Sequence, residues 1–193
     1  MLDVVNRNGD AELAAPVDHV VALLREIGED PDRDGLRDTP ARVLRMLRER
    51  TTGYDADVGA LLSVTFAETH DSLVVVRRVP FASLCEHHLL PFLGHCTVGY
   101  VPRDGVVGLS KLARLVEVYA RRLQVQERMT DQIAQALVDH LRPLAVGVLV
   151  EARHTCMSIR GVERDAPMIT SDLRGLLRER SDLRAEFMAL AGY

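Results

Sequence analysis

The sequence has no tryptophan, and its 193 residues include only four phenylalanines and four tyrosines. Proteins that bind single-stranded nucleic acid stack the bases on aromatic side chains, so this scarcity disfavours that class. The formal net charge of −4 also argues against nonspecific attraction to a phosphate backbone. We therefore expect no nucleic-acid partner.

Long apolar runs are missing as well. No stretch approaches the roughly 20 apolar residues that a membrane-spanning helix needs, so we expect no membrane partner. The first residues lack the basic region and apolar region of a secretory signal. The three cysteines, Cys85, Cys96 and Cys156, form an odd set that is typical of a reducing compartment. The expected location is the cytoplasm.

What is present indicates a globular protein with a substantial core. Apolar residues make up 47% of the chain and charged residues 27%. Helical spacing of apolar residues predicts one helix over 17–27 and a second that begins at Thr39 and is closed by Gly53. We therefore predict an N-terminal helical extension over residues 1–53 and a main domain over residues 54–193.

The main domain combines β-rich and helical segments. Strands are predicted at 64–66, 73–76, 96–101 and 146–152. Helices are predicted from a cap at Ser110, over 125–141 and near 181–190. Because the strands come in pairs instead of alternating with helices, this order favours an α+β fold with an antiparallel sheet.

Two short clusters carry metal-ligand residue types. Cys85, Glu86, His87 and His88 are consecutive, and His154–Cys156 follows much later in the chain. Thiolate and imidazole are preferred zinc ligands, and three protein ligands with one open position are typical of catalytic zinc. The alternative is surface histidines beside buried cysteines. That alternative fits the third cysteine, Cys96, whose alternation with apolar neighbours in a strand predicts a core thiol.

Basic residues gather around a predicted helix start. Lys111 and Arg114 share a helix face next to Ser110, where backbone N–H groups and the helix dipole favour an anion. Arg160 follows the second metal cluster, and Arg42 lies on the N-terminal extension. Each of these residues alone is typical of a solvated surface, and the helix start at Ser110 and Lys111 is the strongest candidate for a phosphate site among them.

A carboxylate and an amide stand side by side at Glu127 and Gln126. A carboxylate can accept hydrogen bonds from N1–H and the exocyclic amine of guanine. Taken alone, the pair is more simply interpreted as polar residues at a helix N-terminus.

In this order, the motifs resemble type I GTP cyclohydrolase from about Gly28 to the C-terminus. The matching segments are 29–31, 38–43, 83–92, 108–114, 124–130, 154–157 and 160–162. The resemblance implies a tunnelling fold, with paired antiparallel strands and two helices on one face, plus the N-terminal helical extension. It also implies an allosteric-type ring homo-oligomer, a homodecamer of two stacked rings with active sites at subunit interfaces.

The implied reaction opens the imidazole ring of GTP, releases C8 as formate and forms 7,8-dihydroneopterin triphosphate, the first step of tetrahydrofolate and pterin biosynthesis. By resemblance, the cofactor is Zn²⁺, which activates the attacking water. The implied roles are as follows: zinc ligands Cys85, His88 and Cys156; proton transfer by His87 and His154; guanine binding by Glu127 and Gln126; triphosphate binding by Ser110, Lys111, Arg114, Arg160 and Arg42. Glu86 is expected to orient a ligand or to contact substrate.

One segment departs from the family pattern. Residues 163–177 run about one residue short, contain few hydroxyls and end in Leu177 where phenylalanine is common. We expect an altered loop beside the active site there.

Two alternatives remain open. A nitrile reductase of 7-deazaguanine metabolism would need a nucleophilic cysteine and a dinucleotide-binding motif, and no such motif is visible. A catalytically dead homologue would usually have lost a ligand or a proton-transfer histidine, and none of these residues is missing.

Overall fold

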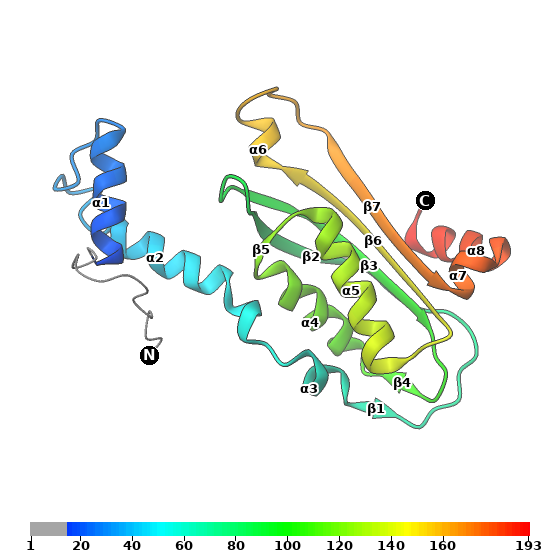
Figure 1. Cartoon of the computed structure of the whole chain (residues 1–193). Helices are drawn as coiled ribbons and strands as arrows, with labels where there is room; N and C mark the ends of the chain where they lie inside the picture. Colours follow the sequence, from blue (N-terminus) through cyan, green and yellow to red (C-terminus); the bar gives the residue numbers. More distant parts are fainter. Residues whose placement is uncertain (1–14) are drawn as a thin grey trace, which may run out of the picture. The chain divides into compact units, whose positions relative to one another are not determined.

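The structure is a computed structural model that describes residues 15–193 (Figure 1). The chain divides into two compact units, Met1–Glu49 and Arg50–Tyr193. Residues 1–14 of the predicted extension lie outside the described residues, and the domain boundary after residue 53 stays a prediction. No helix in the described part is both long and apolar enough to cross a membrane.

The described part of the first unit contains two helices, as predicted. They are α1 (Pro16–Glu26) and α2 (Thr39–Arg50), whose last residue belongs to the second unit. Proline at the first position of α1 supplies a helical φ at no cost in hydrogen bonds. The carboxylate of Asp18 accepts a hydrogen bond from the backbone N–H of Ala15 at 3.0 Å and so caps the helix.

Short elements lead into the second unit. They are the 3₁₀ helix η1 (Thr52–Asp55) and α3 (Val58–Leu62). Gly53 is required here because a Cβ on it would lie 1.9 Å from the carbonyl oxygen of Val118. Gly53, which was predicted to close the second helix, follows the end of α2 and is a point of close backbone packing.

The second unit is built on a five-stranded sheet with the order β5-β2-β3-β6-β7. The strands are β2 (Val74–Cys85), β3 (Pro91–Val101), β5 (Leu123–Gln124), β6 (Ala145–His154) and β7 (Pro167–Gly175). The pairs β2–β3, β3–β6 and β6–β7 are antiparallel, and only the short β5 is parallel to its neighbour. This arrangement confirms the α+β fold with paired antiparallel strands.

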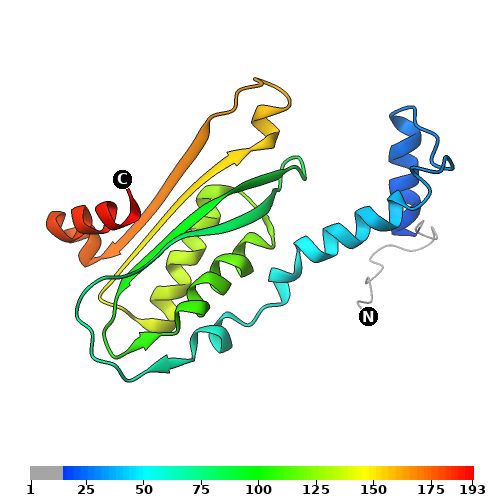
Figure 2. The same cartoon turned by 180° about the vertical axis from the view of Figure 1, so that it is seen from behind.

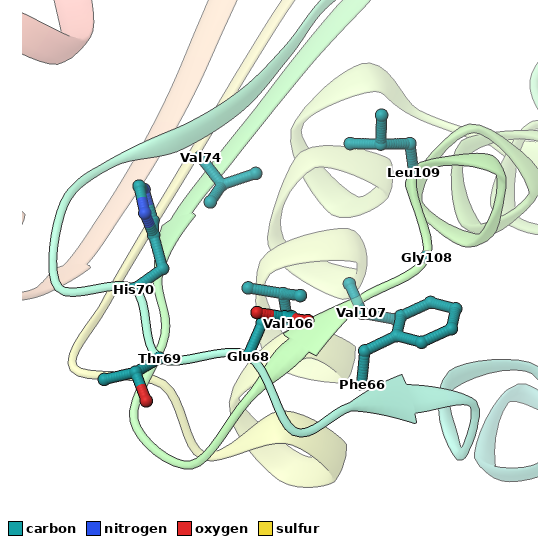
Figure 3. A pocket seen from close by; sticks show the side chains of 9 residues that line it. All are labelled: Phe66, Glu68, Thr69, His70, Val74, Val106, Val107, Gly108 and Leu109. Atoms are coloured by element: carbon teal, nitrogen blue, oxygen red, sulfur yellow. The ribbon is translucent and has the colours of Figure 1, made fainter.

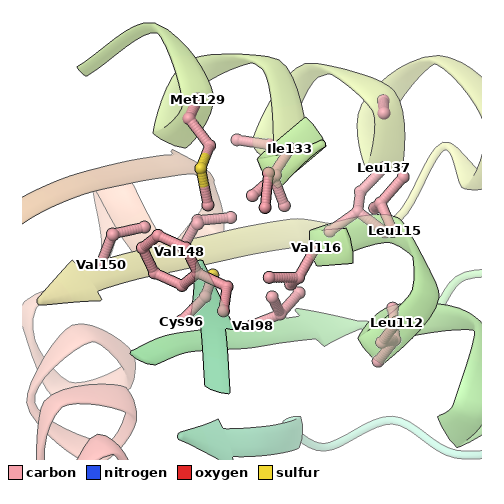
Figure 4. Packing of buried hydrophobic residues seen from close by; sticks show 14 of the residues in the cluster. Cys96, Val98, Leu112, Leu115, Val116, Met129, Ile133, Leu137, Val148 and Val150 are labelled. Carbon is pink, nitrogen blue, oxygen red and sulfur yellow. The ribbon is translucent and has the colours of Figure 1, made fainter. Parts of the chain in front are cut away.

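Two helices cover one face of the sheet, as predicted (Figure 1). They are α4 (Leu109–Ala120) and α5 (Gln126–Leu141). Alternate residues of β3 and β6, among them Cys96, Val98, Val148 and Val150, point into the core beneath these helices (Figure 4). Cys96 has no exposed surface, which confirms the core thiol, and its burial raises the pKa of that thiol.

The opposite face is covered at one end by the C-terminal helices (Figure 2). These are α7 (Leu176–Glu179) and α8 (Ser181–Ala191), so the predicted terminal helix is confirmed. They form a second, smaller core in which Leu177 and Phe187 are fully buried. Leu177 is thus a core residue of this face.

Three details differ from the sequence-based predictions. The strand near 64–66 is β1 (Thr65–Phe66), which pairs with β4 (Val106–Val107) in a separate two-stranded sheet. Ser110 does not cap α4: because β4 ends at Val107, the helix already begins at Leu109, with Gly108 as its N-cap. Segment 163–177 is mostly strand β7, paired with β6 along its length, and not a loop.

Candidate functional site

The two metal-ligand clusters meet at one edge of the sheet. Strand β2 ends at Cys85, and the chain turns back into β3 at Pro91. The register between β3 and β6 places Phe92 opposite His154, so the end of β6 lies beside this turn. The short helix α6 (Thr155–Ser158) begins at the same point and carries Cys156.

The ligand atoms of Cys85, His88 and Cys156 all lie within 4.8 Å of one another. Cys85 is buried, Cys156 is half-buried and His88 is exposed. Within the described residues, no fourth histidine, cysteine or carboxylate joins this group. Two thiols and one imidazole suit zinc, and three protein ligands leave a fourth position open. The residues therefore fit a catalytic zinc site.

Burial raises the pKa of the Cys156 thiol, and the neighbouring Cys85 raises it further. A cation bound between the two sulfurs would reverse this effect, because it stabilises the thiolate that coordinates it. The site is thus a poor place for a free thiolate and a suitable one for a metal.

Glu86 is not a member of this group, and its contacts tie the ligand turn to α5. Its carboxylate forms an ion pair with Arg128 on α5, which lowers the pKa of Glu86. The same guanidinium donates from Nε to Oε1 of Gln124 at 3.1 Å, and the backbone N–H of Glu86 donates to the Gln124 carbonyl at 3.0 Å. Of the two expected roles for Glu86, this geometry favours orientation of the ligand turn.

The two candidate proton-transfer histidines have different surroundings. His87 is exposed, and its Nδ1 lies 3.8 Å from Sγ of Cys85. The half-buried ring of His154 stacks on Phe92, with ring centres 4.6 Å apart and planes 8° from parallel. Burial lowers the pKa of His154, and the nearby Glu127 carboxylate partly opposes this shift. His154 is therefore the more rigidly held of the two.

The side chain of Gln126 points into the protein, and its contact with guanine stays a prediction. It is only 1% exposed, and its amide nitrogen and oxygen are both hydrogen-bonded within the protein. The oxygen lies 2.8 Å from Nε2 of His154. The next residue, Glu127, lines a hollow of about 230 Å³ between α5 and β7 and remains open to a ligand.

Arg160 lies beside the candidate ligand group of Cys85, His88 and Cys156. Its guanidinium donates to Nε2 of His88 at 2.8 Å, so a positive charge stands directly beside the candidate ligand group. Arg42, in contrast, belongs to the first unit, where it forms an exposed ion pair with Asp38 at 3.0 Å.

The remaining basic residues lie at the other end of the sheet. The start of α4 and Val74, the first residue of β2, line one hollow of about 420 Å³ (Figure 3). Cys85 is the last of the 12 residues of β2. At about 3.3 Å per residue, the two ends of this strand are roughly 36 Å apart. A single chain therefore does not bring Ser110 and Lys111 to the metal cluster.

Arg114 is one turn further along α4. It lines a separate hollow of about 360 Å³ together with η1 residues such as Thr52 and Gly53. Arg114 thus lies in a different part of the second unit from the Cys85–Cys156 cluster.

Sequence reasoning missed two residues that hold the site, Arg128 and Phe92. Both work through contacts between distant segments, the first with Glu86 and the second with His154. Their only signal in the sequence is their position beside the recognised motifs.

The sequence profile of the GTP cyclohydrolase I family matches residues 17–192. A GTP cyclohydrolase 1 from Nitrosospira multiformis is 53% identical over 173 residues, which cover 88% of this chain and 90% of the relative. One from Dictyostelium discoideum is 50% identical over 173 residues, covering 89% and 75%. A crystal structure of an archaeosine synthase QueF-Like protein aligns with 54% of this chain and 96% of its own, with 17% identity and a TM-score of 0.43.

The matched region includes both metal-ligand clusters, the α4 start and the α5 N-terminus. Identity near one half over most of both chains places the protein among these enzymes. The chain belongs to the GTP cyclohydrolase I family.

Proposed function

We propose that this protein is a zinc-dependent hydrolase that opens the imidazole ring of GTP. It releases C8 as formate and forms 7,8-dihydroneopterin triphosphate, the first step of tetrahydrofolate and pterin biosynthesis. The observation that carries the proposal is the three-ligand group of Cys85, His88 and Cys156 within a chain of this family. We also expect it to act in the cytoplasm, since its three cysteines are free.

Cys85, His88 and Cys156 would hold the zinc ion. When bound, zinc supplies a Lewis acid that brings the pKa of a water molecule to about 7. His154 would exchange a proton with substrate at Nδ1, because its Nε2 is engaged with Gln126. His87, exposed beside Cys85, would handle the second proton transfer.

Substrate recognition would come from both ends of the sheet in the second unit. Glu127 would accept hydrogen bonds from N1–H and the exocyclic amine of guanine in the hollow that it lines. Arg160 stands beside the metal group and would bind a phosphate oxygen. The further triphosphate contacts would come from Ser110, Lys111, Arg114 and Arg42.

These contacts imply assembly of several copies. The start of α4 lies beside the first residue of β2, and the cluster lies at the other end of that strand, roughly 36 Å away. A complete site would therefore take Ser110 and Lys111 from a second copy. The proposed assembly is a homodecamer with active sites at subunit interfaces. The interfaces within each ring would be heterologous, and such contacts can close into a ring.

The test is turnover of GTP by the purified full chain, with and without chelator, together with metal analysis. Formate and a fluorescent neopterin after oxidation, both lost on chelation and with about one zinc per chain, would support the proposal. Formate without neopterin would mean ring opening without reclosure. Neither product, despite bound zinc, would overturn the proposed reaction.

A further inference from the structure

We propose that Gln126 is a positioning residue that fixes the ring orientation and the tautomer of His154. In this arrangement Nε2 of His154 carries the hydrogen, and Nδ1 is the atom left to exchange a proton. The catalytic consequence rests on the proposed function, whereas the tautomer itself follows from hydrogen bonds within the protein.

The orientation of the Gln126 amide is determined by its partners. Its nitrogen lies 3.0 Å from the carbonyl oxygen of Val150, 3.1 Å from that of Met168 and 3.1 Å from Oγ1 of Thr170. Backbone carbonyl oxygens only accept hydrogen bonds, so the NH₂ group must face them. The amide oxygen must then point the other way, toward His154.

That orientation determines the tautomer of the histidine. The Gln126 oxygen lies 2.8 Å from Nε2 of His154 and can only accept a hydrogen bond. Nε2 must therefore be the donor, and in a neutral imidazole Nδ1 is left as the acceptor. Within residues 15–193, no hydrogen bond from the protein reaches Nδ1 of His154.

A closed cycle of hydrogen bonds keeps the amide in place. Gln126 donates to Oγ1 of Thr170, which lies 2.7 Å from Oγ1 of Thr130. Thr130 donates in turn to the backbone oxygen of Gln126 at 2.7 Å. If Thr170 donates to Thr130, every hydroxyl in the cycle both donates and accepts. Gln126 and Thr130 are 1% and 2% exposed, so water does not compete for these bonds.

The ring is held from a second direction by Phe92. The two rings are 8° from parallel with centres 4.6 Å apart, which leaves rotation within the ring plane as the main freedom of His154. The bond to Gln126 removes that freedom. Orientation by an outer hydrogen bond of this kind usually affects activity by about 10–100-fold when it is lost.

The experiment uses the full chain labelled with ¹⁵N-histidine, in zinc-free and zinc-loaded forms. The His154 signals are identified by comparison with His154→Gln, and their shifts report which ring nitrogen is protonated. We expect the Nε2–H tautomer in the wild-type protein. The Nδ1–H tautomer there would overturn the proposal without any variant being needed.

Gln126→Met removes the amide at similar volume, and we expect averaged tautomer signals for His154 with the zinc content retained. If the variant turns over GTP, kcat should fall by about tenfold or more while KM changes little. A guanine-contact role would instead raise KM and leave the tautomer unchanged, and that result would also overturn the proposal. Gln135→Met is the control for the same substitution on the same helix, because the Gln135 amide donates to the exposed Asp139 and does not contact His154.

Thr170→Val keeps the shape of the site and is the second variant should Gln126→Met misfold. It removes one acceptor of the Gln126 amide, so we expect a smaller tautomer shift in the same direction. An unchanged His154 spectrum in a folded Thr170→Val and a folded Gln126→Met would contradict the proposal. A wild-type protein that fails to act on GTP would refute the proposed function alone, since the spectra are independent of turnover.

Discussion

Gly99 and Gly147 lie opposite each other on β3 and β6, and both leave space for the ring of Phe187. A Cβ on Gly147 would lie 2.8 Å from Cζ of Phe187, and a Cβ on Gly99 would lie 2.8 Å from its Cε2. Neither glycine has a positive φ, so the backbone itself would tolerate other residues. The pair exists because helix α8 packs closely against the sheet at this point.

Gly147→Ala is expected to destabilise the protein by about 1–3 kcal/mol, because the added methyl group overpacks a filled core. The effect should appear as a lower urea midpoint with an unchanged slope. In a Phe187→Leu background, the same substitution should cost less, since the smaller side chain makes room. A double-mutant cycle with strictly additive effects would contradict this contact.

Cys156→Ala is expected to lose zinc and GTP turnover together, because two remaining ligands hold the ion poorly. The matched control is Cys96→Ala, which also removes a thiol but lies in the core, outside the ligand group. That variant should keep its zinc and lose only stability, by about 1 kcal/mol or more. Zinc measured per chain by elemental analysis distinguishes the two, and full metal content in Cys156→Ala would refute the ligand assignment.

Arg128→Gln is expected to weaken zinc binding about tenfold, since it releases the Glu86 carboxylate that anchors the ligand turn. Competition with a chelating dye measures the affinity. Arg33→Gln provides the control, because it breaks an exposed Arg–Glu pair in the first unit and should leave zinc affinity unchanged. Equal affinity in wild type and Arg128→Gln would show that the turn holds its shape without this ion pair.

Glu127→Gln is expected to retain zinc but to raise the KM for GTP by about tenfold or more, since a hydrogen bond to a charged group contributes about 1.5–3 kcal/mol. Inosine triphosphate, which lacks the exocyclic amine, makes the test specific. The wild-type enzyme should prefer GTP to inosine triphosphate, and the variant should largely lose this preference. A variant that discriminates as well as the wild type would remove Glu127 from the guanine site.

Mixed assemblies test whether two copies share a site. Cys156→Ala and Lys111→Ala should each be inactive alone, and random mixing of the two should restore about one quarter of the sites. Cys156→Ala mixed with Cys85→Ala is the control, because both defects lie in the same ligand group and cannot complement. No recovery in assemblies proven to be mixed would mean that one chain supplies the whole site. Lys111 is the sole lysine of the sequence. Amine-selective labelling with and without GTP therefore offers an independent check that Lys111 contacts the substrate.

The spacing of apolar residues predicted many of the helices and strands. The helix over 126–141 and the strand over 145–154 lie close to their predicted positions, since apolar spacing encodes both periods directly. The burial of Cys96 was predicted from its alternating neighbours for the same reason. Strand β7 was missed, because its half-exposed residues show no clear pattern and it exists only through pairing with β6.

The sequence by itself determined the residue types of the site, the order of the motifs and the family. It could not determine which of these residues meet, because that depends on strand register between segments far apart in the chain. Only the tertiary structure brought Cys85 and Cys156 together, turned Gln126 inward toward His154, and left Lys111 at the far end of the sheet. Sequence periodicity assigns a side chain to a face, whereas packing between elements decides its partners.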